Sequence, residues 1–206
     1  MGWNVILLSS GFSNPAILAM VEDAVRDRSY QTGCVITTAH PKKQASPWAK
    51  ATKKQLEKAG LSVSFVDFDA GDKIPDKADV LYICGGNTYH LLSSINTAPF
   101  DVRERVRDVL DHGGLYIGSS AGAVVASSNI ATAGEVGGDK NDDKIDDLTG
   151  LSLTPLYVVP HDTPEQDHAI EQFCSAHSLD DGDVLRISDD EGVFIDSLQG
   201  VVDVVS

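Results

Sequence analysis

Two serines stand between glycines in the segment GSSAG, which follows the apolar run LYI and precedes the apolar run AVVA. This order predicts a strand, a tight turn and a helix, an arrangement that can expose a nucleophile. A residue at such a turn takes strained backbone angles, so the positions two before and two after it must be small. Ser120 has Gly118 and Gly122 at these positions, whereas Ser119 has the larger Ile117 on one side. We therefore expect Ser120 to act as a nucleophile in acyl transfer, and close strand–helix packing is the alternative reason for small residues here.

Backbone amides near Ser120 could stabilise the negative charge that develops in acyl transfer. The helix expected after the serine would direct its free N–H groups toward it, and the amide of Ala121 is the first candidate donor. Gly85 and Gly86 follow the apolar run LYIC, where they permit a turn whose exposed amides can supply a second donor. Asn87 can cap the next helix, which leaves a plain turn with a helix cap as the alternative. We also expect Gly85 and Asn87 to contact a bound substrate.

A serine hydroxyl becomes a strong nucleophile when a base takes its proton, and histidine is the most frequent base. His161 ends the apolar run LYVVP, and functional residues collect at the carboxyl ends of parallel strands. His40 also follows a predicted strand and is a second candidate. A turn residue without chemistry is the alternative interpretation of His161. Solvated or packing roles are expected for the four histidines in or beside predicted helices: His90, His112, His168 and His177.

The carboxylate that would orient the histidine is harder to choose, because the chain contains 31 aspartate and glutamate residues. Glu191 lies in DDEG between two predicted C-terminal strands, and Glu135 lies just beyond the helix that follows GSSAG. We expect one of these two to complete a triad with Ser120 and His161. Asp162 is adjacent to His161 in sequence, but neighbouring side chains on an extended segment point apart.

Short apolar runs rich in β-formers alternate with helical patterns over most of the chain. This alternation predicts a mostly parallel sheet covered by helices on both faces, an α/β fold. Near the C-terminus, VLRIS, GVFID and VVDVV predict short antiparallel strands at the sheet edge, separated by DDE and SLQG. The acidic, glycine-rich segment 134–147 predicts a mobile surface loop. We expect strands at 5–10, 34–39, 62–68, 79–85, 115–119 and 156–161, and helices at 15–27, 47–60, 102–114 and 164–177.

Composition limits the class of protein and its partners. The 206 residues fit a single domain, 1–206, and 42% hydrophobic with 23% charged residues is ordinary for a soluble globular protein. A formal net charge of −15 argues against a nucleic-acid partner, which would favour a basic surface. Three distant cysteines, no basic leader and no long apolar segment indicate a cytoplasmic protein without a membrane partner. We expect a monomer or a homodimer.

Four segments in order carry a resemblance to a known family: ICGGNTYHLL, GGLYIGSSAGAVVA, the histidine in PHD and the EG near the C-terminus. Over about residues 60–195 the chain resembles peptidase family S51, the family of the aspartyl dipeptidases, and more distantly the cyanophycinases. The resemblance implies a three-layer α/β/α fold similar to class I glutamine amidotransferases, and serine-type hydrolysis of a short peptide without a metal or cofactor. By position it implies Ser120 as nucleophile, His161 as base and Glu191 as the carboxylate that orients the base. It also implies Gly86 and Ala121 as the oxyanion hole. Glu135 lies where family members carry an aspartate that is also proposed as the acid.

The chain departs from that family after the histidine. Aspartyl dipeptidases bind an N-terminal aspartate through an arginine in this segment, whereas DTPEQDHAIEQF contains neither arginine nor lysine. Since a buried carboxylate needs a cation, aspartyl specificity does not follow from the sequence. A catalytically inactive or regulatory protein that binds a small molecule in the same crevice is the alternative. Glutamine amidotransferase chemistry would require a cysteine in place of Ser120, whereas Cys84 lies beside the glycine turn.

Overall fold

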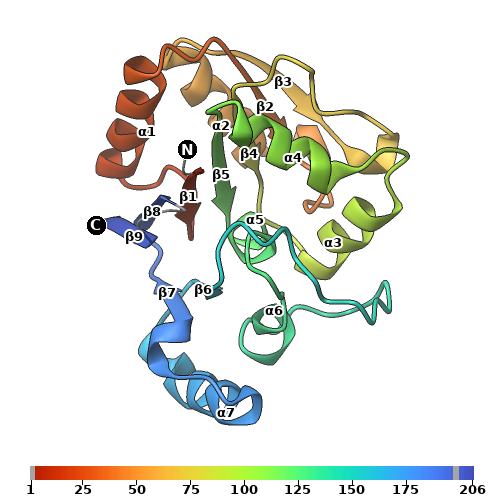
Figure 1. Cartoon of the computed structure of the whole chain (residues 1–206), viewed down its shortest axis with the longest axis vertical. Helices are drawn as coiled ribbons and strands as arrows, with labels where there is room; N and C mark the ends of the chain where they lie inside the picture. The colour runs from red at the N-terminus through yellow and green to blue at the C-terminus, as the bar shows by residue number, and fades with distance from the viewer. Residues whose placement is uncertain (1–2, 197–199) are drawn as a thin grey trace.

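A seven-stranded mixed sheet forms the centre of the protein (Figure 1). The computed structural model describes residues 3–196 and 200–206. The strands of this sheet follow the order β3-β2-β4-β5-β1-β8-β9. The first five are mutually parallel, whereas β8 runs antiparallel to β1 and β9 runs antiparallel to β8. Their bounds are β1 Asn4–Leu8, β2 Thr32–Ile36, β3 Ser62–Val66, β4 Val80–Ile83, β5 Leu115–Ser119, β8 Gly192–Asp196 and β9 Gly200–Val205.

Helices cover both faces of the sheet, because apolar side chains alternate between the two faces along each strand. In β1, Ile6 and Leu8 pack with α1 and α2, whereas Val5 and Leu7 pack with α3, α4 and α5 on the opposite face. This arrangement confirms the three-layer α/β/α fold with a mostly parallel sheet and antiparallel edge strands. The helix bounds are α1 Pro15–Asp27, α2 Pro47–Lys58, α3 Thr88–Thr97, α4 Val102–Asp111, α5 Ala121–Val125, α6 Thr132–Glu135 and α7 Asp167–His177, with short 3-10 helices η1 Lys43–Ala45, η2 Phe68–Ala70, η3 Pro164–Gln166 and η4 Asp181–Asp183.

Two helices that border the carboxyl edge of the sheet begin at prolines. Pro15 is the first residue of α1, and the side chain of Asn14 before it accepts a hydrogen bond from the Ala16 amide at 2.8 Å. Pro47 is the first residue of α2. Because proline has no N–H group and a fixed φ, it suits a first helical turn, and these starts fix where the loops after β1 and β2 end.

A second, two-stranded parallel sheet lies outside the main one and corrects part of the sequence prediction. It consists of β6 (Tyr157–Pro160) and β7 (Val184–Ile187). The runs LYVVP and VLRIS were expected in the main sheet, the second as an antiparallel edge strand. The spacing of apolar residues identifies a strand but does not choose its partner, so the error lies in pairing. Figure 1 shows β6, β7, α6 and α7 beyond the carboxyl end of β5.

The remaining sequence expectations fall on loops. The segment 134–147 begins inside α6 and then continues without regular structure. The Asn87 side chain donates to the Lys140 carbonyl at 2.9 Å, so this loop is tied to the start of α3. In the connection SLQG before β9, residues 197–199 lie outside the described residues. Within the described ranges, no helix is long and apolar enough to cross a membrane.

Candidate active site

Strand register places the candidate residues at one edge of the main sheet. Leu8 at the end of β1 pairs with Ser119 at the end of β5, and Ile83 at the end of β4 pairs with Gly118. The segments that follow these strands therefore leave the sheet side by side. They contain the serines after β1, the glycines after β4 and the serine after β5, so segments about a hundred residues apart in sequence form one site.

Ser120 occupies the strained turn that the spacing of glycines predicted. Its backbone angles are φ 51° and ψ −114°, and α5 begins at the next residue. The left-handed region is costly for a residue with a side chain, so the surrounding structure must hold it there. Its amide donates to the Leu8 carbonyl at 2.9 Å, which fixes the turn against β1.

Glycine at 118 and 122 is required by close backbone approach. A Cβ atom on Gly118 would lie 2.3 Å from the Gly122 carbonyl oxygen, and one on Gly122 would lie 2.2 Å from the carbonyl oxygen of Ile83. Both distances are far below van der Waals contact, so a larger residue would displace α5 from the sheet. The packing explanation and the strained-turn explanation therefore hold together: tight packing of α5 holds Ser120 in its conformation.

His161 reaches Ser120 from the second sheet. Its Nε2 atom lies 3.0 Å from Ser120 Oγ, and its Nδ1 atom lies 2.6 Å from Asp189 Oδ1. Pro160 at the end of β6 pairs in register with Ile187 at the end of β7, so the residues that follow these strands are neighbours. His161 has φ 59°, another left-handed residue at the site. An imidazole held between a hydroxyl and a carboxylate has the geometry of a general base.

The carboxylate beside His161 is that of Asp189, which the sequence analysis did not select. Ser10 and Ser9 donate hydrogen bonds to Asp189 Oδ1 at 2.7 and 2.8 Å. The pKa of Asp189 is lowered to about 2. The hydrogen bond from Ser10 lowers it most, those from Ser9 and His161 lower it further, and desolvation opposes them. The carboxylate is therefore ionised at neutral pH.

Ser9 connects the two sheets at the site. It directly follows β1, and its Oγ accepts a hydrogen bond from the His161 amide at 2.8 Å while donating to Asp189. Ser9 is fully buried. The sequence analysis did not select Ser9, because nothing near it in sequence indicates a partner 152 residues away. Hydroxyls directly after a central parallel strand are the signal that could have found Ser9.

The structure places neither predicted glutamate at His161. Glu191 lies in the turn between β7 and β8, where its carboxylate accepts from the Ser188 amide at 2.8 Å and closes the turn that presents Asp189. Glu135 at the end of α6 lies 3.0 Å from Nε2 of His177 in α7. The predicted Glu191 and the observed Asp189 lie two residues apart in the same turn. Side chains in such a tight turn point in different directions, so the spacing of residues does not show which carboxylate reaches the histidine.

The loop after β4 lies against Ser120. A Cβ atom on Gly85 would lie 2.9 Å from Ser120 Cβ, and one on Gly86, which has φ 148°, would lie 2.0 Å from the Ala39 carbonyl oxygen. Ala121 is the first residue of α5, so its amide has no acceptor within the helix. Gly85 therefore borders Ser120 directly, Gly86 lines the same cavity, and the role of Gly86 and Ala121 as an oxyanion hole stays a prediction. Asn87 caps α3 by accepting a hydrogen bond from the His90 amide at 2.8 Å, and its contact with a substrate stays a prediction.

The other histidines have partners of their own. His90 lies between Asp69 and Asp143, at 2.9 and 3.0 Å. His40, the second candidate base, accepts from the Lys42 amide through Nδ1 and lies 3.4 Å from Ser46 Oγ through Nε2. Three further histidines contact residues of their own helices or of a neighbouring one: His112 with Asp108, His168 with Gln172 and His177 with Glu135.

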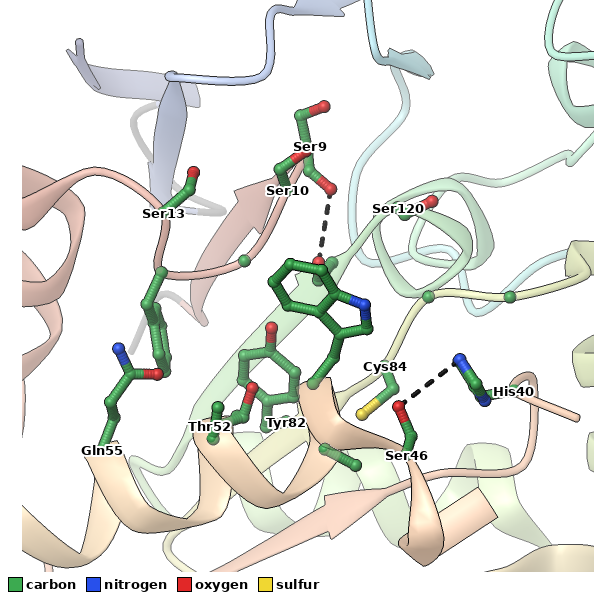
Figure 2. Close-up of a pocket in the computed structure, with 18 of the residues that line it drawn as sticks. Ser9, Ser10, Ser13, His40, Ser46, Thr52, Gln55, Tyr82, Cys84 and Ser120 are labelled. Carbon is green, nitrogen blue, oxygen red and sulfur yellow. Dashed lines mark hydrogen bonds between the residues drawn. The ribbon is translucent and has the colours of Figure 1, made fainter. Parts of the chain in front are cut away.

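A cavity of about 430 Å³ opens beside these residues (Figure 2). Ser120, His161 and both glycines after β4 contribute to its wall, together with the loop after β1 and the first turns of α2. Cys84 also lines it, and burial raises the pKa of its thiol to about 12. A thiol that stays protonated is a poor nucleophile, which disfavours cysteine-dependent amidotransferase chemistry here.

Fold and site together define a class of protein: an α/β/α protein with a serine, a histidine and an aspartate joined at the carboxyl edge of its sheet. The chain belongs to peptidase family S51, whose family model matches residues 5–199. An uncharacterised peptidase of Listeria innocua is 29% identical over 163 residues, covering 76% of this chain and 75% of its own. A peptidase E of Salmonella newport is 38% identical over 96 residues, 43% of this chain and 36% of its own.

A solved structure supports the fold over the whole length. It is of a Listeria monocytogenes protein described as a candidate peptidase E, with a TM-score of 0.70 and 25% identity, and it covers 100% of both chains. An uncharacterised peptidase from the same species is 27% identical over 196 residues, covering 92% of this chain and 93% of its own. The family predicted from the four sequence segments is thus confirmed.

Proposed function

We propose that this protein is a serine-type peptidase that hydrolyses a dipeptide or another short peptide. The observation that carries the proposal is the connected set Ser120 Oγ, His161 Nε2, His161 Nδ1 and Asp189 Oδ1, with separations of 3.0 and 2.6 Å. Membership of a peptidase family supports peptide-bond hydrolysis as the reaction. The cavity of about 430 Å³ supports a small substrate, since pockets for small ligands range from about 300 to 1,000 Å³.

In the first half of the reaction, Ser120 Oγ attacks the substrate carbonyl carbon while His161 Nε2 takes the hydroxyl proton. The negative charge moves to the carbonyl oxygen, where the amides of Gly86 and Ala121 donate to it. His161 then gives the proton to the departing amine as the C–N bond breaks. An acyl group remains on Ser120.

In the second half, water takes the place of the amine. His161 removes a proton from the water as it attacks the acyl carbon, and the same proton returns to Ser120 Oγ when the ester bond breaks. Asp189 accepts the Nδ1–H bond throughout, which selects the imidazole tautomer with its free lone pair on Nε2. The ionised carboxylate also stabilises the imidazolium that forms in each half-reaction.

Covalent labelling and turnover test the proposal separately. A fluorophosphonate should label Ser120, and peptide mapping should locate the adduct on that residue. Ser120→Ala should abolish labelling and lower kcat on a dipeptide panel by about 10³-fold or more. Ser128→Ala is a matched control, because Ser128 is exposed and does not line the cavity. Undiminished hydrolysis by Ser120→Ala would refute the proposal, and peptide binding without turnover by the wild type would favour a binding protein.

A further inference from the structure

The cavity beside Ser120 has an unusual lining for a site that would bind an acidic residue. Of the described residues that line it, none is a lysine, arginine, aspartate or glutamate. Trp48, Phe12 and Tyr82 supply aromatic surface, and Ala49 and Ala51 supply aliphatic surface. Figure 2 shows the hydroxyls of the lining and the Gln55 side chain around the same space. Apart from the two histidines His40 and His161, the described lining therefore offers no ionisable side chain of opposite charge to a charged substrate group.

Most polar groups of this lining already have partners within the protein. Ser9 and Ser10 donate to Asp189, and Ser119 Oγ donates to the Ser9 carbonyl at 3.3 Å. Ser46 pairs with His40. Burial raises the pKa of the Tyr82 phenol, so it stays protonated. Because these hydroxyls are occupied, the surface left for a ligand is mainly apolar.

Two cations in segments next to the site are paired with carboxylates of the protein. Arg186 in β7 binds Asp162 and Asp167 at 2.9 and 2.5 Å, next to the segment that follows His161. Lys43 in η1 binds Asp69 and donates to the Thr38 carbonyl at 2.7 Å. With a formal net charge of −15, the molecule also repels anionic ligands over longer distances. No lysine or arginine of the cavity lining is therefore available to pair with a substrate carboxylate.

Trp48 is the most exposed aromatic residue of this lining. It is the second residue of α2 and 76% exposed, the highest exposure found for a large apolar side chain in the described residues. Its neighbour Ala49 is buried, so the helix beneath it is anchored. Phe12 packs edge-to-face on Tyr82 with ring centroids 5.3 Å apart, which holds a second aromatic surface in place. An apolar group that entered the cavity would cover Trp48 and gain from its removal from water.

We propose that this cavity binds an uncharged, apolar side chain, preferably aromatic, of the residue next to the scissile bond, with Trp48 and Phe12 as specificity-determining residues. The inference rests on the proposed peptidase function and adds its substrate class: short apolar peptides in place of aspartyl peptides. The aromatic and aliphatic wall comes mainly from α2 and the loop after β1. The segment after His161, which carries no arginine or lysine, is not part of the lining.

Two dipeptide series test the substrate class. In Xaa-Ala and Ala-Xaa, Xaa is Phe, Leu, Asp or Lys, so the series also shows on which side of the bond the cavity lies. We expect kcat/KM in one series to be at least about 10-fold higher for Phe and Leu than for Asp and Lys, the ratio that one well-filled apolar contact provides. Highest activity on Asp, or equal activity on all four side chains in both series, would overturn the inference.

Two variants locate the effect in the cavity. Trp48→Ala should lower the Phe-to-Asp ratio of kcat/KM by about 10-fold, while the fluorophosphonate labelling rate of Ser120 and the melting temperature stay near wild type. Gln55→Arg should raise activity on the Asp peptide, whereas Gln55→Met, of similar length and uncharged, should not. An unchanged ratio in Trp48→Ala would refute the role of Trp48.

Fluorophosphonate labelling of Ser120 distinguishes failure of the proposed peptidase function from failure of the substrate inference. If the fluorophosphonate does not label Ser120, the proposed peptidase function fails. If it labels Ser120 but the wild-type enzyme prefers acidic peptides, the peptidase function stands and the substrate inference alone fails.

Discussion

His161 contacts Ser120 across two different sheets. The serine follows β5 of the main sheet, the histidine follows β6 of the small sheet, and their side chains meet at 3.0 Å. Ser9 joins the two sheets, because it follows β1 of the main sheet and its Oγ accepts a hydrogen bond from the amide of His161, which follows β6 of the small sheet. The site is therefore assembled only when the small sheet is docked at the carboxyl edge of the main one.

Replacement of three acidic residues should identify the functional carboxylate. Asp189→Asn should lower kcat by about 10³–10⁴-fold with little change in KM, because the imidazole would lose its orienting partner and adopt the wrong tautomer. Glu135→Gln should leave kcat near wild type, since its partner is His177. Steady-state kinetics on the best dipeptide would measure these effects.

The third variant distinguishes a direct from an indirect effect. Glu191→Gln retains an oxygen that can accept from the Ser188 amide, so the turn that presents Asp189 should persist. Its kcat should fall much less than that of Asp189→Asn. A loss as large as that of Asp189→Asn would assign the acid to Glu191 and refute the geometry.

Removal of the Ser10 hydroxyl should shift the ionisation of Asp189. The folded-state pKa of this residue is about 2, below its ordinary value of about 3.9, so its contribution to stability is present above pH 4 and is lost as the pH falls through about 2. Ser10 supplies the largest stabilisation of the charged form. Ser10→Ala should therefore raise the pKa of Asp189, measured by carboxyl ¹³C NMR titration. Ser13→Ala, which removes a bond to the Asp189 backbone carbonyl only, is the control, and an equal shift in both variants would contradict the assignment.

Much of the main sheet and of the site could be predicted from the sequence, because both depend on local patterns. Apolar runs marked the strands, and their order predicted a parallel sheet. The steric demand at GSSAG selected Ser120 over Ser119, and its positive φ agrees with that choice. His161 was chosen because it follows a predicted strand, and the structure places its Nε2 atom 3.0 Å from Ser120 Oγ.

The contacts that the sequence did not predict depend on pairing over long distances. β6 and β7 pair with each other outside the main sheet, which no local pattern reveals. Asp189 differs from Glu191 only in how a tight turn directs its side chain. Ser9 acquires its role from a histidine 152 residues away. Each of these depends on tertiary geometry, whereas composition and spacing describe only neighbours along the chain.

Cys84 tests whether a thiol takes part in the chemistry. Burial raises the pKa of this thiol to about 12, so almost none of it is thiolate at pH 7.5. We expect brief iodoacetamide treatment of the native protein to leave Cys84 unmodified and activity unchanged, as shown by mass spectrometry of peptides. Cys174, which is partly exposed, should be modified first. Rapid alkylation of Cys84 with parallel inactivation would instead favour cysteine-dependent chemistry.

A methyl group at Gly118 should test the packing that holds Ser120 in its strained turn. Gly118→Ala would place a Cβ atom 2.3 Å from the Gly122 carbonyl oxygen, so α5 must move. We expect the free energy of unfolding to fall by about 1–3 kcal/mol, the usual cost of overpacking, and fluorophosphonate labelling of Ser120 to slow. Gly182→Ala is the matched control, because no atom lies within 4 Å of its added Cβ, and its stability should change by less than about 0.5 kcal/mol. If Gly118→Ala unfolds at the wild-type denaturant concentration and labels at the wild-type rate, close packing of α5 does not hold the nucleophile in place.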